Sequence, residues 1–171
     1  DALRTNLTIR WFYTGMVLYF VTCAQCALQV TQTFQKLIHF SDWVVGHAHL
    51  VMFGVFSMWF FGMMTYLMPR LLNTSWWSRS LCEWHYWLSA VGIGVMFLDL
   101  TIAGLFEGFY WVSIRPWQES VDGAHGFWIV RLFAGLTMIS GQLVFLYNLW
   151  MTWRKSKSAV SAAVPAPAYA T

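Results

Sequence analysis

Long apolar runs separated by short polar segments make up most of the chain. Four of these runs exceed the roughly 20 residues that a helix needs to cross about 30 Å of hydrocarbon. They cover residues 11–35, 43–69, 84–108 and 127–153. The alternation of apolar and polar residues that is typical of membrane barrel strands does not occur in the sequence. The pattern therefore predicts an all-α integral membrane protein with four transmembrane helices.

Composition agrees with this pattern, because 58% of the residues are hydrophobic, only 10% are charged and the mean hydropathy is +0.53. A soluble domain has about 25% charged residues. The first run starts at Trp11 and has no small-residue cleavage site, so we do not expect a signal peptide. Residues 1–154 are predicted to form the membrane region. Residues 155–171, rich in Ala, Val, Ser and Pro, are predicted to form a disordered cytoplasmic tail.

Basic residues predict the orientation of the four spans. Both termini and residues 70–83 fall on one side, which holds seven Lys and Arg residues against three on the other. The positive-inside rule then places both termini in the cytoplasm and the start of the second span toward the periplasm or its equivalent. The net charge of +3 reflects this sidedness and gives no reason to expect nucleic-acid binding. The seven are Arg4, Arg10, Arg70, Arg79, Arg154, Lys155 and Lys157, and the three are Lys36, Arg115 and Arg131.

The triplet His47-Ala48-His49 places two imidazoles inside the second apolar run. Ionisable side chains within membrane spans are rare and usually functional. Because an α-helix turns about 100° per residue, the two rings point out of opposite sides of one helix. They cannot share one metal ion, but each can hold a planar cofactor on its own side. This geometry suits two hemes on one transmembrane helix; the alternative is two core histidines bonded to neighbouring helices.

Other ionisable residues offer further candidates. Arg131 lies about one turn inside the predicted fourth helix, where it can bind an anion such as a heme propionate or extend to the outer headgroups. His125, at the start of that helix, can bond to a propionate, bind a partner or be solvated. Asp99, deep in the third run, is a candidate for a proton path. Glu107 is expected to be a hydrated cap, and His85 an anchor at the opposite interface.

Cysteine spacing predicts no covalent cofactor. Cys23 and Cys26 lie inside the first run, where a C-x-x-C redox pair would lack water, so they are expected to be small residues at a helix interface. No C-x-x-C-H motif for a c-type heme occurs. Any heme on this chain is therefore expected to be held by histidine and packing.

Several segments together resemble a known family. Residues 39–50, which include the histidine pair, resemble the segment leading into helix ten of the catalytic subunit (subunit I) of cbb3-type cytochrome c oxidases. These enzymes belong to the heme-copper oxidase superfamily and are related to the large subunit of nitric oxide reductases. Residues 66–70 resemble the end of that helix, residues 83–88 and 103–108 resemble helix eleven, and residues 147–152 resemble the close of helix twelve.

The resemblance implies roles for the residues singled out above. The four helices would match the last four of the twelve-helix bundle of a terminal oxidase, which reduces dioxygen to water with proton uptake. His47 would be the axial ligand of the high-spin heme b, and His49 one of two axial ligands of the low-spin heme b. Arg131 and His125 match the region that approaches the heme propionates.

The departure from the family pattern is also informative. Three features of the family have no counterpart here: the helix with the second low-spin ligand, the three histidines that bind copper, and the tyrosine cross-linked to one of them. The resemblance therefore implies no catalytic residues in this chain beyond the heme ligands. The start at Asp1 is expected for a fragment, a processed product or one piece of a split subunit. We expect a partner chain with the remaining helices and the copper, and cytochrome c-type subunits as further partners.

Two alternatives remain open at this point. The first is a portion of a nitric oxide reductase large subunit, with non-heme iron in place of copper. The second is a non-catalytic diheme electron carrier or a structural membrane subunit.

Overall fold

The computed structural model describes residues 2–163, and these residues form helices joined by short loops, with no strand among them. Four stretches are long and apolar enough to cross a membrane, which confirms the predicted fold class. These stretches are Leu7–Gln29, Asp42–Leu71, Arg79–Trp111 and Trp117–Ser158. The elements are α1 (Ala2–Thr5), α2 (Leu7–Gln29), α3 (Gln32–Ile38), α4 (Asp42–His49), the π-helix η1 (Leu50–Ser57), α5 (Met58–Leu71), α6 (Arg79–Trp111) and α7 (Trp117–Ala163).

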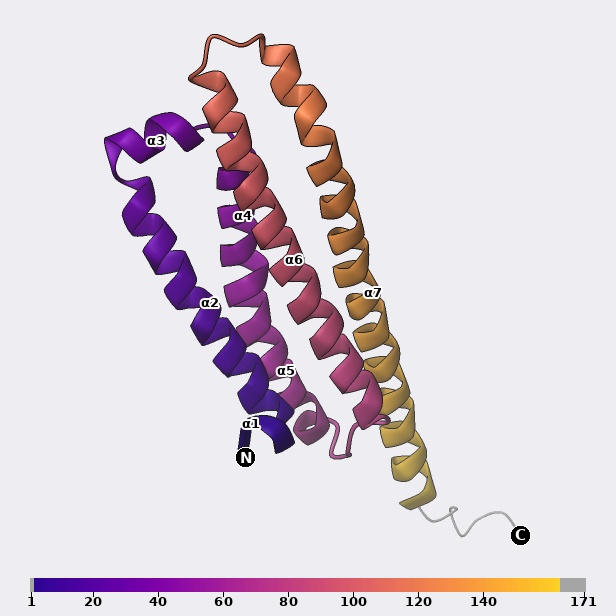
Figure 1. The fold of residues 1–171 in the computed structure, drawn as a ribbon. Coiled ribbons are helices and arrows are strands. Elements are labelled where there is room, and N and C mark those ends of the chain that lie inside the picture. Colours follow the sequence, from indigo (N-terminus) through magenta and orange to yellow (C-terminus); the bar gives the residue numbers. More distant parts are fainter. Residues whose placement is uncertain (1, 164–171) are drawn as a thin grey trace, which may run out of the picture.

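The long helices form an elongated bundle (Figure 1). The segments α4, η1 and α5 form one continuous rod, with α2 beside it on one flank and α6 on the other. Helix α7 packs on the far side of α6. The α1 helix and the last turns of α7 lie at one end of the bundle, and α3 and the α6–α7 connection lie at the other (Figure 1).

The structure moves the ends of the first predicted span. Helix α2 ends at Gln29 instead of continuing to residue 35, and the chain turns into the separate short helix α3. The Thr31 hydroxyl donates to the Leu28 carbonyl at 2.8 Å and so satisfies one of the carbonyls that a helix end leaves free. A hydropathy pattern does not register this local hydrogen bond, and residues 30–35 contain no Asp, Glu, Lys or Arg that would mark the end of the span.

The last helix is longer than predicted at both ends. It begins at Trp117, ten residues before the expected start at 127, and it continues to Ala163 where a disordered tail was expected from Lys155. Two side chains fix the extension to the α5–α6 loop: Lys155 Nζ donates to Ser75 Oγ at 2.8 Å, and Ser156 Oγ donates to the Leu72 carbonyl at 2.7 Å. The rest of the predicted tail, residues 164–171, lies outside the described residues.

Helix α6 is the centre of the packing, because it contacts both α4 and α7 along much of its length. Its fully buried Ile93 and Leu100 belong to a core that also contains Trp11 of α2 and Met58 of α5. Small residues allow the helices to approach closely, as is common in membrane bundles. The tightest approach is at Gly104, where an added Cβ would overlap the backbone of Trp43.

We predict that Gly104→Ala destabilises the bundle, because the new methyl group has no space against the α4 backbone. The expected cost is about 1–3 kcal/mol, which is the usual range for overpacking. Gly94→Ala is the matched control on the same helix, since no atom of this chain lies within 4 Å of the added Cβ. Thermal unfolding of the purified complex measures both variants, and equal effects would contradict the packing described here.

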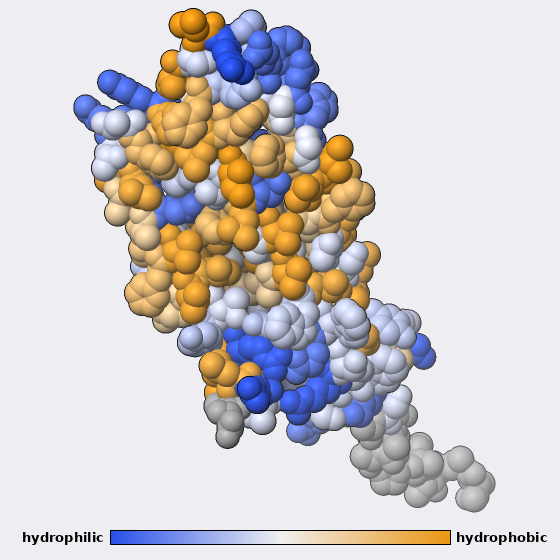
Figure 2. Space-filling model, in the orientation of Figure 1, coloured by the Kyte–Doolittle hydropathy of each residue, from blue (hydrophilic) through white to orange (hydrophobic). Residues whose placement is uncertain are grey.

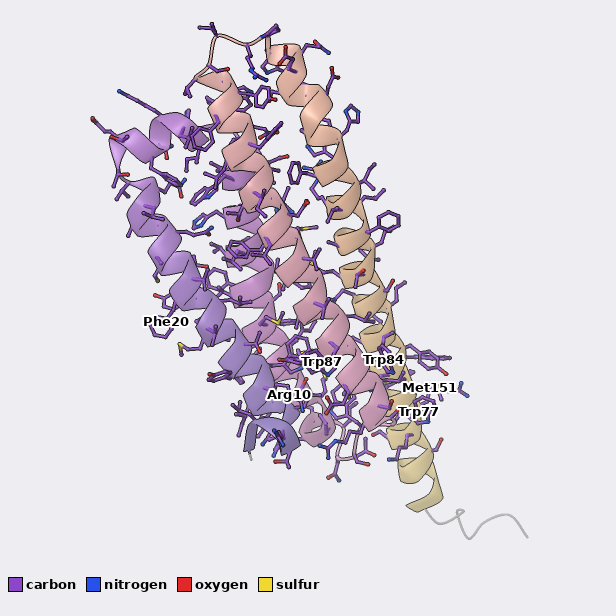
Figure 3. All side chains as sticks on the ribbon, in the orientation of Figure 1. Arg10, Phe20, Trp77, Trp84, Trp87 and Met151 are labelled. Atoms are coloured by element: carbon purple, nitrogen blue, oxygen red, sulfur yellow. The ribbon has the colours of Figure 1, made fainter. Side chains whose placement is uncertain are left out.

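The surface divides into a broad apolar band between two hydrophilic ends (Figure 2). Near the end that holds α1, the tryptophans Trp77, Trp84 and Trp87 lie at the same level of the bundle (Figure 3). This distribution is typical of an aromatic belt at a membrane interface. Arg10 of α2 forms an ion pair there with Glu83 of α6.

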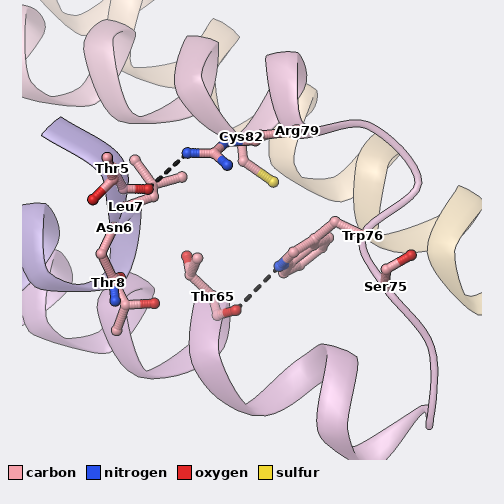
Figure 4. Close-up of a pocket in the computed structure, with 9 residues that line it drawn as sticks. All are labelled: Thr5, Asn6, Leu7, Thr8, Thr65, Ser75, Trp76, Arg79 and Cys82. Atoms are coloured by element: carbon pink, nitrogen blue, oxygen red, sulfur yellow. Dashed lines mark hydrogen bonds between the residues drawn. The ribbon is translucent and has the colours of Figure 1, made fainter. Parts of the chain in front are cut away.

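The same end contains an open cavity of about 560 Å³ (Figure 4). Arg79 Nη2 donates to the Thr5 carbonyl at 2.7 Å, and Trp76 Nε1 donates to the Thr65 carbonyl at 3.1 Å. These bonds tie α1 to α6 and the α5–α6 loop to α5. The polar lining is therefore used largely to hold the helix ends together.

Candidate functional site

The two histidines occupy the last turn of α4, a helix whose beginning is fixed by its neighbours. Ser41 is the N-cap, and its hydroxyl accepts a hydrogen bond from the Trp43 N–H at 3.3 Å. The Glu107 carboxylate of α6 accepts a hydrogen bond from the Asp42 N–H at 2.7 Å. Both acceptors satisfy N–H groups that the first turn of a helix leaves free. The direction of the imidazoles is therefore set by a helix that is anchored at its start.

His47 faces α2. Its Nδ1 lies 3.0 Å from Oε1 of Gln25, a buried polar side chain near the C-terminal end of α2. The imidazole also stacks on the Trp43 ring at 5.7 Å between centroids, with 6° between the planes. If Nδ1 donates to Gln25, the second ring nitrogen, Nε2, carries a lone pair. Nε2 lies 3.6 Å from Sγ of Cys26, whose exposed side chain can rotate away.

His49 faces the opposite flank, toward α6 and α7. Its Nδ1 lies 2.8 Å from the Val45 carbonyl oxygen. Because a carbonyl only accepts, Nδ1 must donate its proton, and neutral His49 keeps a lone pair on Nε2. The side chain lines an open groove of about 350 Å³ whose other lining residues are apolar except for one arginine. They are Met96, Arg131, Leu132, Gly135, Leu136 and Ile139.

Arg131 and Asp42 form the charged part of this site. Arg131 Nη1 lies 3.5 Å from Asp42 Oδ1, and Trp128 Nε1 donates to Asp42 Oδ2 at 2.8 Å. The Arg131 side chain is still 39% exposed, so the pair does not use all of its donors. Arg131 lies about four turns into α7, not one turn, because the helix begins at Trp117.

Asp42 was missed by the sequence reasoning. The available signal was a carboxylate directly before a long apolar run, at the first turn of the helix that carries both histidines. Gln25 was missed as well, although it is a polar side chain in the middle of the first apolar run.

The remaining candidates lie around this site without joining it. Asp99 is buried on α6, and its Oδ2 has no hydrogen-bond partner among residues 2–163. Glu107 is buried and accepts a backbone N–H, so the expectation of a hydrated cap was wrong. His125 is exposed on α7 with its ring 5.3 Å from the Trp128 ring. It is thus next to the tryptophan that bonds to Asp42, but it does not line the His49 groove.

His85 lies far from the pair and is not an interfacial anchor, as the sequence had suggested. It is 2% exposed and is enclosed by the rings of Trp11, Phe61 and Phe145. Within the part of the chain that the structure describes, no three His, Cys, Asp or Glu residues come together to hold a metal ion.

A π-helix begins directly after His49, a feature that the hydropathy pattern did not predict. The Ser57 hydroxyl donates to the Met52 carbonyl at 3.0 Å and supports this wider turn. Segments of π-helix are rare and occur frequently at functional sites. Because η1 starts at Leu50, it changes the register of the rest of the span but leaves the directions of His47 and His49 as an α-helix sets them.

The donor set fits two hemes better than a small metal ion. Each imidazole has a polar partner at Nδ1, only the Cys26 thiol lies next to His47 Nε2, and the two rings face different flanks of α4. The His49 groove adds apolar walls for a porphyrin and a cation for its carboxylates.

The fold and the two histidines together define the class of protein: an all-helical membrane protein with two separate imidazole sites on one helix. Residues 1–137 match the family described as Cytochrome C and Quinol oxidase polypeptide I. The chain belongs to this family, whose members are heme-copper oxidases.

Individual relatives give the same result. The chain is 30% identical to cytochrome c oxidase subunit 1 of Rhodobacter capsulatus over 98% of the chain and 33% of that protein. It is 26% identical to the cbb3-type cytochrome c oxidase subunit CcoN1 of Stutzerimonas stutzeri, over 92% of the chain and 35% of the relative. A nitric oxide reductase subunit of the same organism is 26% identical over 77% of the chain and 29% of that protein.

The fold is also found in a solved structure of a heme-copper terminal oxidase dimer, with a TM-score of 0.72 and 17% identity. That match covers 86% of this chain and 26% of the solved one. The chain spans about a third of the length of the curated relatives that it matches.

Proposed function

We propose that this chain is the heme-bearing portion of the catalytic subunit of a cbb3-type terminal oxidase. His47 would be the axial ligand of a high-spin heme b, and His49 one of two axial ligands of a low-spin heme b. The similarity to the cbb3-type subunit CcoN1 supports the type of oxidase. The low-spin heme supplies electron transfer, and the high-spin heme together with copper supplies the reduction of dioxygen to water.

The observation that carries this proposal is the hydrogen bond from His49 Nδ1 to the Val45 carbonyl. Because the acceptor has no proton to give, Nδ1 carries a proton, and in the neutral imidazole the lone pair lies on Nε2. Heme-ligating histidines are commonly oriented by a hydrogen bond at the other ring nitrogen. Gln25 has the same role for His47, and its burial favours a fixed ring.

Arg131 would bind the propionates of the low-spin heme with the donors that Asp42 leaves free. His125 would assist from its place beside Trp128. Asp99, buried with one oxygen unpartnered among the described residues, would accept and release a proton on the path of proton uptake.

The proposal requires partners, because a binuclear centre needs ligands that this chain does not supply. We propose a chain with the remaining helices of subunit I, which holds the copper, and cytochrome c-type subunits as electron donors. The excess of basic residues at the end with α1 and the α5–α6 loop supports a bacterial inner membrane protein with both termini in the cytoplasm. The histidines would then lie toward the periplasmic side.

The second candidate is a portion of a nitric oxide reductase, which the similarity to the Stutzerimonas stutzeri reductase favours. The two enzymes differ in the metal next to the high-spin heme.

The test is an optical and metal analysis of the complex purified from its native membrane. The proposal predicts one heme b that binds carbon monoxide, one low-spin heme b that does not, and copper. Extra non-heme iron instead of copper would identify the reductase. Two hemes that both fail to bind carbon monoxide, or no heme, would contradict a catalytic role.

A further inference from the structure

A groove of about 400 Å³ runs between the end of α5 and the second half of α7. It lies roughly 30 Å along the helix from His49, at the end of the bundle that holds α1. All of its lining side chains are apolar, and two of them are tryptophans. The lining residues are Met68, Leu72, Leu146, Leu149, Trp150 and Trp153.

Each of the two tryptophans carries a cation on its ring. Lys157 Nζ lies 4.0 Å from the centroid of Trp153, and Arg154 Cζ lies 5.1 Å from the centroid of Trp150. Neither Arg154 nor Lys157 takes part in an ion pair among residues 2–163, and α7 has no Asp or Glu after Asp122. Both cations are exposed, so their positive charge is available at the end of an apolar groove.

Lys155 differs from these two cations although it is on the same turn of α7. Its ammonium bonds to Ser75 Oγ at 2.8 Å and therefore turns toward the α5–α6 loop. The chain thus provides one cation with a hydrogen-bond partner in the α5–α6 loop and two that lie on the rings of tryptophans lining the groove.

We propose that this groove binds an anionic phospholipid, with an acyl chain against the apolar lining and the phosphate on Arg154 and Lys157. Apolar walls suit an acyl chain, and cations at the membrane surface favour anionic headgroups. A soluble phosphate would use the cations but not the groove. The site is independent of the proposed heme ligands, because no residue is shared between them.

The experiment uses the complex purified in detergent, stripped of lipid and titrated with phosphatidylglycerol. Native mass spectrometry then counts the lipids that remain bound. We expect retention of phosphatidylglycerol over phosphatidylcholine. Arg154→Gln and Lys157→Gln should each lower this retention about fivefold, the effect of about one cation at a membrane surface. Leu149→Trp, which fills the groove, should lower the retention of both lipids.

Lys155→Gln is the matched control and should leave phosphatidylglycerol retention unchanged. An equal loss in Lys155→Gln would overturn the proposal, because it would indicate general surface charge. Displacement of the lipid by soluble glycerol phosphate would also overturn it, since the acyl chain would then contribute nothing. Failure to retain any lipid would overturn the proposal too, because another protein segment would then fill the groove.

Discussion

Replacing His47 with alanine is expected to abolish carbon monoxide binding by the purified complex while the low-spin heme band remains. Alanine removes the Nε2 ligand on the α2 side of α4 and leaves His49, which faces the other flank, in place. Because a heme without its axial histidine is held by packing alone, we expect loss of the high-spin heme. Carbon monoxide difference spectra of the reduced complex measure the effect.

Cys26→Ala is the control for this variant, because it removes the side chain next to His47 Nε2 but keeps the imidazole and its bond to Gln25. Carbon monoxide binding should persist in Cys26→Ala. If both the carbon monoxide signal and the low-spin band survive in His47→Ala, the assignment of the pair is wrong.

Replacing His49 with alanine is expected to have the reciprocal effect. The low-spin band should disappear, carbon monoxide binding should remain, and oxygen consumption with an external electron donor should fall to background. The reason is that the proposed low-spin heme would lose its His49 ligand in the groove between α4 and α7, so electrons would no longer pass through it. Absorbance spectra of the reduced complex and oxygen-electrode measurements provide the two readings.

Val45→Ala is the matched control for His49→Ala. The substitution keeps the backbone carbonyl that accepts the His49 Nδ1–H, so the ring should stay oriented and the low-spin band should remain. Retention of the low-spin band in His49→Ala would show that another residue ligates that heme.

Hydropathy was sufficient to predict four membrane helices, because that prediction depends only on the length of the apolar runs. The pitch of an α-helix was sufficient to predict that His47 and His49 diverge. Hydropathy placed helix ends less well. The break after Gln29 and the start of α7 at Trp117 depend on local hydrogen bonds, such as Thr31 Oγ1 to the Leu28 carbonyl and the Glu119 N–H to the Pro116 carbonyl, which hydropathy does not register. The π-helix after His49 left no recognisable trace in the sequence pattern.

The partners of the histidines were the least predictable part of the site. Gln25 and His47 are separated by 22 residues, and Asp42 and Arg131 by 89 residues, so their contacts arise only when the helices pack. Arg131 itself was predicted as a cation near the pair, but its bond to Asp42 requires the long α7 to lie beside the start of α4.

The central claim is that one chain provides axial ligands for two separate hemes. The most direct measurement is the ratio of heme b to this chain in the purified complex, determined by the pyridine hemochromogen spectrum, which separates b-type from c-type heme. We predict two hemes b for each wild-type chain and one in either His47→Ala or His49→Ala. A wild-type ratio below two, or a ratio that neither substitution lowers, would contradict the account.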